Sequence, residues 1–281
     1  MAAFDLATLT RRARNPRRTV IPLRPIALPA LQASQLYASV YLPVLNIWAA
    51  SADTIVAAYA QSLAELQTDS PADVTARIES AQTSAAGVIV QLRFAIGRWS
   101  AAVEAWHRRR WTANVLTATS VDLQTMLGAS DVRATLATVI ERNVALVSSV
   151  SDETKRRIAD AAFRGLTERK TAAEFAREVR GFVDMSRARS KRIAGDQLSK
   201  MGGELNDERR RQAGIDSWEW IHSAKRNPRE DHLARNGLFY SDNPERWGKR
   251  YEGRLFRKPP AERPSQLPFC GCTSRAVLLL D

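Results

Sequence analysis

The chain is poor in the residues from which disulfide frameworks and metal clusters are built. Its 281 residues include two cysteines and three histidines. Cys270 and Cys272 lie two positions apart, and in an extended segment that spacing keeps their Cβ atoms too far apart for a mutual disulfide. An internal disulfide framework is therefore excluded, as is usual for proteins assembled in a reducing cytoplasm.

Long apolar runs and phosphate-cradling glycine loops are also missing. No stretch approaches about 18 consecutive apolar residues, so we expect no membrane span and no secretory signal. No glycine-rich loop of the P-loop or dinucleotide-binding type is present, which argues against enzymes that bind nucleotide phosphates. With 44% hydrophobic residues, the chain still has enough apolar side chains for a substantial core.

Positive charge is what the chain has in excess. The formal net charge is +12 and the sequence pI is near 10.4, and most of the basic residues are arginines. Arginine binds phosphate through a planar fork of donors, although the same residues also cover solvated helix faces. The charge favours a polyanionic partner such as nucleic acid or an acidic protein surface. The candidate nucleic-acid contacts are Arg11, Arg12, Arg14, Arg17, Arg18, Arg108, Arg109, Arg110, Arg209, Arg210 and Arg211.

The N-terminal segment combines arginine with proline. Residues 11–29 carry six arginines and no acid, and the prolines among them are incompatible with a regular helix. We therefore expect an extended cationic arm over residues 1–30. Such an arm could lie along phosphates or in a partner's groove, and a solvated tail is the alternative interpretation.

Residues 31–150 are rich in alanine and predict long helices. Ser70-Pro71-Ala72-Asp73 has the pattern of an N-cap, a proline at the first helical position and an acid in the first turn. Apolar or small residues then recur in alternating steps of four and three from Val74 to Trp106, which predicts coiled-coil-like packing against another helix. Core packing is favoured over a ligand-binding aromatic box for Trp99, Trp106 and Trp111. We expect this region to bind a partner or a second copy through a helical surface.

Three shorter helices are predicted after a boundary near residue 150. The first begins with Ser151 as its cap and ends at Gly165. The second begins at the capping box Thr171–Glu174 and ends at Gly181, and the third spans about residues 186–212 and is closed by Gly214.

The residues after Gly214 predict a small α+β unit. Alternation predicts strands over residues 217–221 and 238–240 and one or two closing strands after residue 268, with a long loop over residues 241–266. A short helix is expected from an N-cap at Asn227 to Gly237. The predicted fold is thus α+β and predominantly α-helical, with segments 1–30, 31–150 and 151–281.

The candidate site consists of His232, Cys270 and Cys272, with His222 as a fourth candidate. Alternate residues of an extended segment point to one face, so the two thiols should face the same way. Two thiolates and an imidazole are ligands for zinc, although structural zinc sites usually use two pairs of more widely spaced ligands. The favoured interpretation is no cofactor, with buried thiols packed beside a hydrogen-bonded histidine, and zinc is the alternative.

Catalytic interpretations have less support. His232 could form a nucleophile pair with either cysteine. However, no residue at a characteristic spacing in the sequence suggests a group that would orient the histidine or an oxyanion site. Asp231, His232 and Asn236 only faintly resemble a metal nuclease. We therefore expect a protein that is not an enzyme.

Several landmarks occur in a fixed order from about residue 150 to the end. They are Ser151–Thr154 with Gly165-Leu166, Thr171–Ala176, Ser186–Ala188 leading to Arg192–Gln197, Gly214-Ile215 before Trp218 and Trp220, Arg229-x-x-His232 with Asn236-Gly237, and Pro268-x-Cys270-x-Cys272. In this order the chain resembles the phage Mu F-like head morphogenesis family, the minor head proteins of tailed phages. It departs from the family at Lys225-Arg226-Asn227, where an acid and an arginine are usual, and at Gly195 and Gly271, where arginine is common.

The resemblance implies a minor capsid protein at the portal vertex inside the phage head, assembled in the host cytoplasm. Its implied partners are the portal protein, packaged double-stranded DNA bound without sequence readout, and the major capsid or scaffold protein, with no membrane in the mature particle. It implies roles in head assembly and in DNA packaging or ejection. The alternatives are a toxin or enzyme, nuclease-like or a transferase, that carries a Mu F-like delivery module, and a cellular nucleic-acid-binding module. Neighbouring genes for portal, terminase and capsid proteins would argue against the last.

Overall fold

The protein forms two compact units whose residues are interleaved along the sequence. A computed structural model describes residues 4–13, 18–65, 72–128 and 132–280. Unit 1 consists of Met1–Gln32, Ser100–Ala137 and Gly195–Asp281, and unit 2 consists of Ala33–Trp99 and Thr138–Ala194. Neither unit coincides with the expected consecutive segments 31–150 and 151–281, because three long helices each contribute residues to both units.

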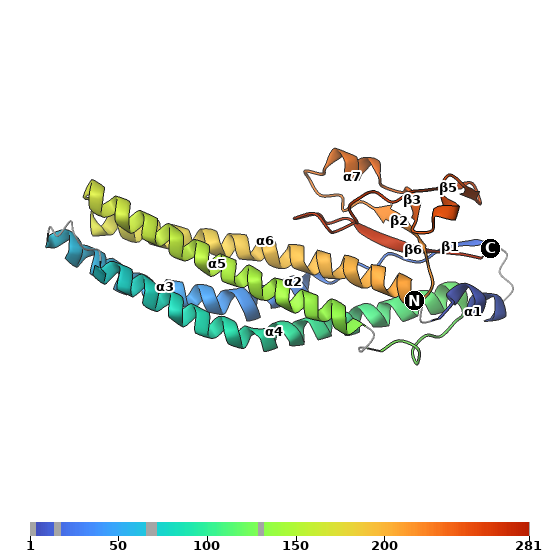
Figure 1. Ribbon diagram of the computed structural model, residues 1–281, viewed down its shortest axis with the longest axis horizontal. Helices are drawn as coiled ribbons and strands as arrows, with labels where there is room; N and C mark the ends of the chain where they lie inside the picture. Colours follow the sequence, from blue (N-terminus) through green and yellow to red (C-terminus); the bar gives the residue numbers. More distant parts are fainter. Residues whose placement is uncertain (1–3, 14–17, 66–71, 129–131, 281) are drawn as a thin grey trace. The chain divides into compact units, whose positions relative to one another are not determined.

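The helices account for most of the chain, and the strands lie mainly in its C-terminal part, which confirms a predominantly α-helical α+β fold (Figure 1). The helices are α1 (Leu6–Ala13), α2 (Ala30–Leu36), a π-helical turn (Tyr37–Tyr41), α3 (Leu42–Ala64), α4 (Ala72–Thr119), α5 (Arg133–Glu168), α6 (Ala172–Gln212) and α7 (Glu230–Ala234). The predicted cap residues Ser70 and Pro71 lie outside the described residues, but Asp73 does stand in the first turn of α4.

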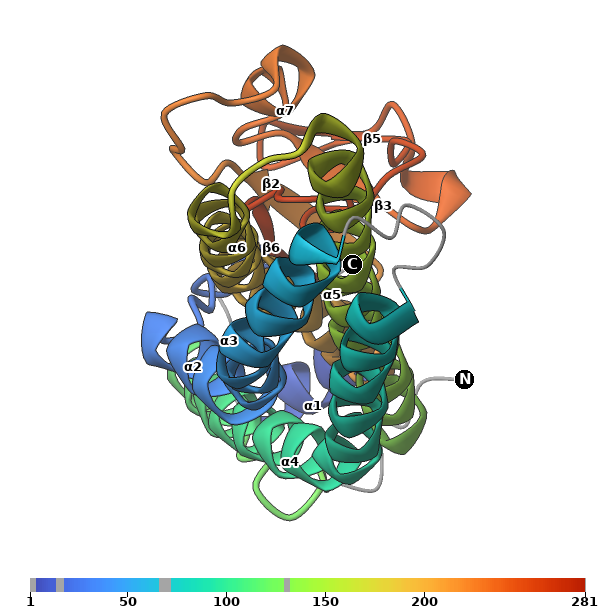
Figure 2. The same ribbon diagram turned by 90° about the vertical axis from the view of Figure 1, so that its left-hand side faces the viewer.

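Unit 2 is a bundle in which α3 and parts of α4, α5 and α6 lie side by side (Figure 2). Its core is apolar but crossed by specific polar contacts. The indole Nε1 of Trp48 donates to Ser151 Oγ at 2.9 Å, and the ring of Tyr59 stacks on Phe175 with centroids 4.2 Å apart. Ser151 was expected to cap a helix, but it is buried in the middle of α5, so the predicted boundary near residue 150 is wrong.

By length and composition alone, the helical stretch Ala30–Ala64 could cross a membrane. Its side chains at Val44, Leu45, Trp48 and Ile55 are fully buried within the unit. A core helix of a packed bundle meets the same test, and 39% of the apolar stretch that meets it is buried inside the protein.

The long helix predicted from the apolar repeat is confirmed as α4. The predicted positions Val74, Ile78, Ala81 and Ala85 are buried. Farther along, Ile89 and Ile96 take the core positions expected for Val88 and Ala95. A straight helix has 3.6 residues per turn, so a buried stripe drifts by one position against a 3.5-residue repeat within a few turns. Trp99 and Trp111 are buried as core residues, as predicted.

Two glycines that were expected to end helices lie inside them. Gly165 belongs to α5, where a Cβ atom would come within 2.7 Å of the Tyr59 hydroxyl, so glycine makes room for that ring. Gly181 lies within α6, which continues to Gln212. The residue that ends α5 in a left-handed conformation is Arg169, with φ of 56°. Packing against neighbouring helices therefore outweighs the local cost of these glycines.

The capping box that begins α6 is confirmed. The backbone N–H of Glu174 donates to Thr171 Oγ1 at 3.3 Å, and the N–H of Thr171 donates to Glu174 Oε2 at 2.9 Å. The hydrogen bond from the Thr171 N–H is the main reason that the pKa of Glu174 is lowered.

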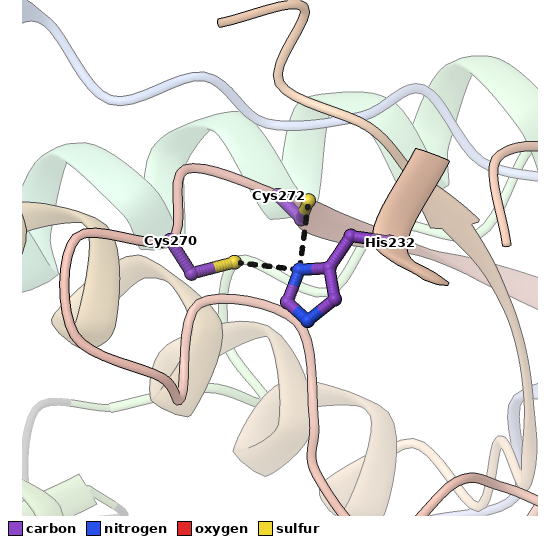
Figure 3. Close-up of side chains that lie close together, drawn as sticks. All are labelled: His232, Cys270 and Cys272. Atoms are coloured by element: carbon purple, nitrogen blue, oxygen red, sulfur yellow. Dashed lines mark hydrogen bonds between the residues drawn. The ribbon is translucent and has the colours of Figure 1, made fainter. Parts of the chain in front are cut away.

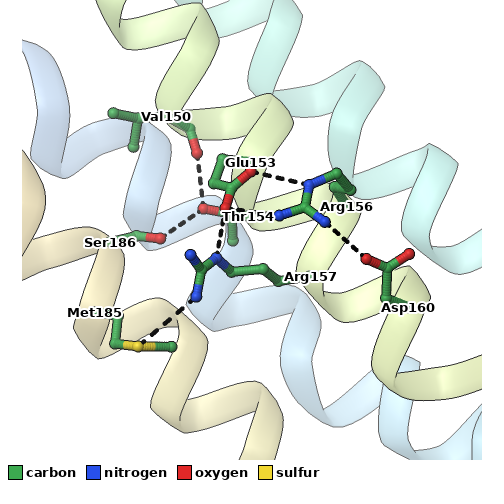
Figure 4. A network of polar contacts seen from close by, with 8 residues as sticks. All are labelled: Val150, Glu153, Thr154, Arg156, Arg157, Asp160, Met185 and Ser186. Carbon is green, nitrogen blue, oxygen red and sulfur yellow. Dashed lines mark hydrogen bonds and ion pairs between the residues drawn. The ribbon is translucent and has the colours of Figure 1, made fainter. Parts of the chain in front are cut away.

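Polar contacts also join the surface of α5 to its neighbours in unit 2 (Figure 4). Glu153 accepts hydrogen bonds from Arg156 and Arg157, which lower its pKa to about 2. The contacts of ionised Glu153 therefore contribute to the stability of the folded chain above the ordinary carboxyl pKa. That contribution to stability is lost as the pH falls toward 2. Beneath the surface, the hydroxyls of Thr154 and Ser186 lie 2.8 Å apart and link α5 to α6.

Unit 1 contains a six-stranded sheet of order β1-β6-β2-β3-β5-β4. The strands are β1 (Val20–Pro22), β2 (Ser217–Ile221), β3 (Phe239–Ser241), β4 (Arg250–Tyr251), β5 (Arg254–Arg257) and β6 (Thr273–Leu279). The predicted strands before residue 241 and after residue 268 are confirmed, but residues 241–266 are not one long loop, because β4 and β5 form a hairpin there. All strand pairs are antiparallel except β3 with β5.

The expected extended arm over residues 1–30 is wrong for most of its length. Residues 6–13 form α1, and Val20 pairs with Leu279 across β1 and β6. Leu6 and Leu23 are almost completely buried in the core of unit 1. A proline prevents a helix only at its own position and close to it. In this segment, apolar residues between the arginines pack in the core and pair with the sheet. Arg14 and Arg17 lie outside the described residues.

Buried polar residues connect α4 and α6 to the sheet of unit 1. The ring Nε2 of His107 lies 2.9 Å from Asn206 Oδ1, and Asn206 Nδ2 donates to Thr273 Oγ1 at 3.2 Å. Asn206 can only accept through Oδ1, so His107 carries a proton on Nε2. Burial lowers the pKa of His107 to about 4, because the charged imidazolium loses hydration.

This histidine should make the stability of the protein depend on pH. Between pH 6.5 and 4 the unfolded chain protonates His107 and the folded chain does not, so the free energy of unfolding should fall by roughly 3 kcal/mol across this window. Urea unfolding at a series of pH values would measure the slope. In His107→Gln that part of the slope should vanish, whereas His222→Gln should keep it. Equal slopes in the wild type and His107→Gln would contradict the assignment.

Candidate metal centre

His232 reaches the site from α7, the short helix that follows β2. The helix has Arg229 as its N-cap rather than the predicted Asn227, and it begins at Glu230. Gly237, with φ of +76°, ends the turn, and its N–H donates to the carbonyl of Trp220 at 2.8 Å. The imidazole of His232 meets the Trp220 indole edge-on at 5.0 Å between centroids and is 2% exposed.

Cys270 and Cys272 reach the same point from the segment that enters β6 (Figure 3). The Sγ atoms of Cys270 and Cys272 lie 3.4 Å and 3.7 Å from His232 Nδ1. Both thiols are free and buried, as the alternation of side chains predicted. Trp218, Trp220 and Tyr240 complete the apolar cluster around them.

The turn before the cysteines is held by three side chains from unit 1. The N–H of Phe269, which has φ of 58°, donates to Asp196 Oδ1 at 2.5 Å, and Lys225 Nζ donates to the carbonyl of Phe269 at 2.7 Å. Arg229 donates to the carbonyl of Pro268 at 3.0 Å. These contacts fix the direction from which Cys270 approaches the imidazole.

Gly271 and Lys225 lie against each other. A Cβ atom at position 271 would stand 2.5 Å from Lys225 Cε and 3.0 Å from Ser223 Cβ. Lys225 therefore occupies the space that a larger residue between the two cysteines would need.

The two thiols influence each other's protonation. The pKa of Cys270 is lowered to about 5, chiefly because the Cys272 thiol donates a hydrogen bond to its thiolate. The pKa of Cys272 is raised for the reciprocal reason, and burial adds to the rise. One proton thus leaves the pair readily and the second does not, since two adjacent buried thiolates repel each other.

Two carboxylates lie near the other ring nitrogen of His232, Nε2. His232 Nε2 lies 3.7 Å from Glu262 Oε1 and 4.0 Å from Asp231 Oδ2. Both carboxylates also form ion pairs with Arg235, which lowers the pKa of Glu262 through a hydrogen bond. Because Arg235 already neutralises these carboxylates, the sulfur side of His232 is the better cation site.

His222, the fourth ligand considered, is not brought into the cluster of His232, Cys270 and Cys272. Its Nδ1 accepts a hydrogen bond from the N–H of Ala224 at 3.1 Å. Asn236 was considered above as a possible nuclease residue. In the structure its Oδ1 accepts a hydrogen bond from the backbone N–H of His222 at 3.0 Å. Both residues thus stabilise the connection between β2 and α7.

The arginines proposed for nucleic-acid contact divide into exposed and buried groups. Arg209 and Arg210 are 0% and 3% exposed, so their assignment as phosphate contacts is wrong. Arg209 pairs with Glu104 and Arg210 with Asp207. Arg108 is half-buried and donates to the carbonyl of Leu127 at 3.3 Å. The exposed members are Arg11, Arg12, Arg18, Arg109, Arg110 and Arg211.

Sequence reasoning assigned no role at the site to Asp196, Glu262 and Lys225, and Asp196 stands far from it in the sequence. Asp196 lies 73 residues before the Phe269 amide that it binds. Pairing of such residues depends on the folded chain, and a single sequence carries no signal for it. Gly271 was the one visible hint, since a glycine between two buried cysteines implies a close neighbour.

A comparison with known families covers this part of the chain. Residues 156–275 match the family model described as Phage Mu protein F like protein. The matched segment begins within α5, ends within β6 and includes His232, Cys270 and Cys272. It confirms the resemblance predicted from the order of landmarks. No curated protein and no solved structure matches the chain.

Proposed function

From the Phage Mu F-like identity of residues 156–275, we propose that this chain is a minor head protein bound to the portal inside a tailed-phage capsid. It assists head assembly and DNA packaging or ejection, and its partners are the portal protein, the packaged DNA and the capsid or scaffold protein. The family match is the observation that carries the proposal. The helical bundle of unit 2 is the part that we assign to the portal or to a second copy.

Co-purification tests the portal half of the proposal. The full chain should bind portal oligomers of the same phage and should be present in mature particles. Failure to bind the portal together with absence from particles would contradict the assignment. An effector enzyme with a delivery module, the alternative, would instead show an activity that His232→Ala abolishes.

The exposed arginines of unit 1 are the residues that we expect to bind DNA. Arg11 and Arg12 are exposed on α1, and Arg109 and Arg110 are exposed on α4. Both helices pack on the same hydrophobic core, through Leu6 and neighbours of Trp111. With a net charge of +12, this surface suits phosphate contacts that carry no sequence information.

The DNA contact predicts a specific salt dependence. Affinity for double-stranded DNA should fall steeply as salt rises, and replacing Arg11, Arg12, Arg109 and Arg110 by alanine should reduce the slope of log K against log salt by up to about 4. A matched control replaces Arg93, Arg156, Arg164 and Arg187, which are ion-paired in unit 2. Fluorescence anisotropy would measure both. Equal slopes in the two variants, or a flat response of the wild type, would remove DNA from the partners.

A further inference from the structure

The distances around His232 Nδ1 match those expected around a zinc ion. With Zn–S near 2.3 Å and Zn–N near 2.05 Å, a tetrahedral angle places a sulfur and a nitrogen ligand about 3.6 Å apart. Cys270 Sγ and Cys272 Sγ lie 3.4 Å and 3.7 Å from Nδ1. All three donor atoms lie within 4.8 Å of one another, so one ion can contact them together.

Hydrogen bonding alone accounts poorly for this arrangement. An imidazole nitrogen has either one N–H or one lone pair in the ring plane, so Nδ1 forms one good hydrogen bond and not two. Here both sulfurs approach the same nitrogen (Figure 3). A cation between the three atoms would use the single lone pair of Nδ1 and a lone pair of each sulfur.

Burial and charge also fit a zinc ion. Cys270, Cys272 and His232 are 3%, 2% and 2% exposed, and tryptophans line the cluster. Two thiolates and a neutral imidazole neutralise a divalent ion, so the loaded centre would carry no net charge in this apolar surrounding. Thiolate and imidazole ligands favour zinc over the oxygen-seeking magnesium and calcium.

The opposite nitrogen of His232 has a carboxylate nearby, although the two lie beyond hydrogen-bond distance. His232 Nε2 is buried and has no hydrogen-bond partner within the described residues, and Glu262 Oε1 lies 3.7 Å away. A metal on Nδ1 would place the ring proton on Nε2, where it points toward this carboxylate. Carboxylates in that position orient zinc-binding histidines and strengthen them as ligands.

We propose that Cys270, Cys272 and His232 bind one zinc ion that fastens the start of β6 to α7. The described residues supply three donors, so water or another exogenous ligand completes the tetrahedron. Because its protein donors come from two segments of the chain, the ion would hold these segments together. This site is independent of portal and DNA binding, and its test uses metal content rather than assembly.

Elemental analysis of the full chain tests the proposal. After equilibration with zinc and removal of free metal, the wild type should hold about one zinc per chain, and Cys270→Ser, Cys272→Ser and His232→Gln should each lose most of it. His222→Gln provides the matched control, because His222 lies outside the cluster, and it should keep the metal. Glu262→Gln should weaken zinc affinity roughly 10–100-fold.

Two measurements on the wild type keep the test decisive if a variant fails to fold. Cobalt in place of zinc should produce thiolate-to-metal charge-transfer absorption and the intense visible bands of a tetrahedral ion. Zinc should also protect both thiols from a thiol-specific reagent, and a chelator should remove the protection. A wild type without bound zinc, without cobalt–thiolate absorption and with thiols that react equally with and without zinc would overturn the proposal.

Discussion

Replacing Glu104 by glutamine is expected to lower the free energy of unfolding by about 3–5 kcal/mol. The carboxylate of Glu104 is 2% exposed and pairs with Arg209, which is 0% exposed. It also lies 3.3 Å from the Nε of Arg108. Removing the carboxylate leaves the buried Arg209 charge without the carboxylate that it pairs with in the folded chain, and such a charge is costly.

Urea unfolding of the single and double variants would measure this effect. The double variant Glu104→Leu/Arg209→Met should recover most of the loss, because no buried charge is left without its partner. Arg93→Ala is the matched control, since the Arg93–Glu141 pair has side chains that are 55% and 58% exposed and solvent screening leaves such a pair with little effect on stability. A loss in Glu104→Gln as small as in this control would refute the argument.

A fragment limited to residues 151–281 is expected to remain largely unfolded. Cutting the chain there divides α5 and removes β1, so β6 loses the antiparallel partner that pairs along Val20–Pro22. The core of unit 1 also loses Leu6, Leu23, Trp111 and Val115, all of which are buried. Burial of each such side chain contributes on the order of 1.5–3 kcal/mol, and the four together are comparable to the net stability of a typical domain.

Circular dichroism and thermal unfolding of the fragment would test this expectation against the full chain. The fragment should lack a cooperative transition and the near-ultraviolet signal of packed tryptophans. Adding residues 1–150 as a separate chain should restore both, because it supplies the missing strand and core residues. Cooperative unfolding of the fragment alone would show that the family segment folds without its N-terminal partners.

Local patterns predicted those parts of the fold that depend on residues close in sequence. The Thr171–Glu174 capping box and strand β2 were predicted correctly, since hydrogen bonds and alternation act over a few residues. The facing thiols of Cys270 and Cys272 followed from the same alternation. Their meeting with His232 was a hypothesis that chemistry suggested, and the folded chain brings the three together.

Tertiary context decided the features that the sequence could not predict. The run Arg209–Arg211 looks like a solvated basic cluster, yet Glu104, about a hundred residues earlier, makes Arg209 a buried residue. Gly165 resembles a helix end until Tyr59 is placed against it. The arginine- and proline-rich start of the chain resembles a tail, because nothing within it reveals the strand with which it pairs.

The pairing of Val20 with Leu279 has a consequence for synthesis of the protein on the ribosome. Unit 2 uses only residues between Ala33 and Ala194, so it can fold while translation continues. Strand β1 is made before that unit but must wait until β6 has left the exit tunnel, and such distant pairings form slowly. A chain released early by the ribosome would leave β1 without its partner strand, and such an unpaired edge is prone to pair with another chain.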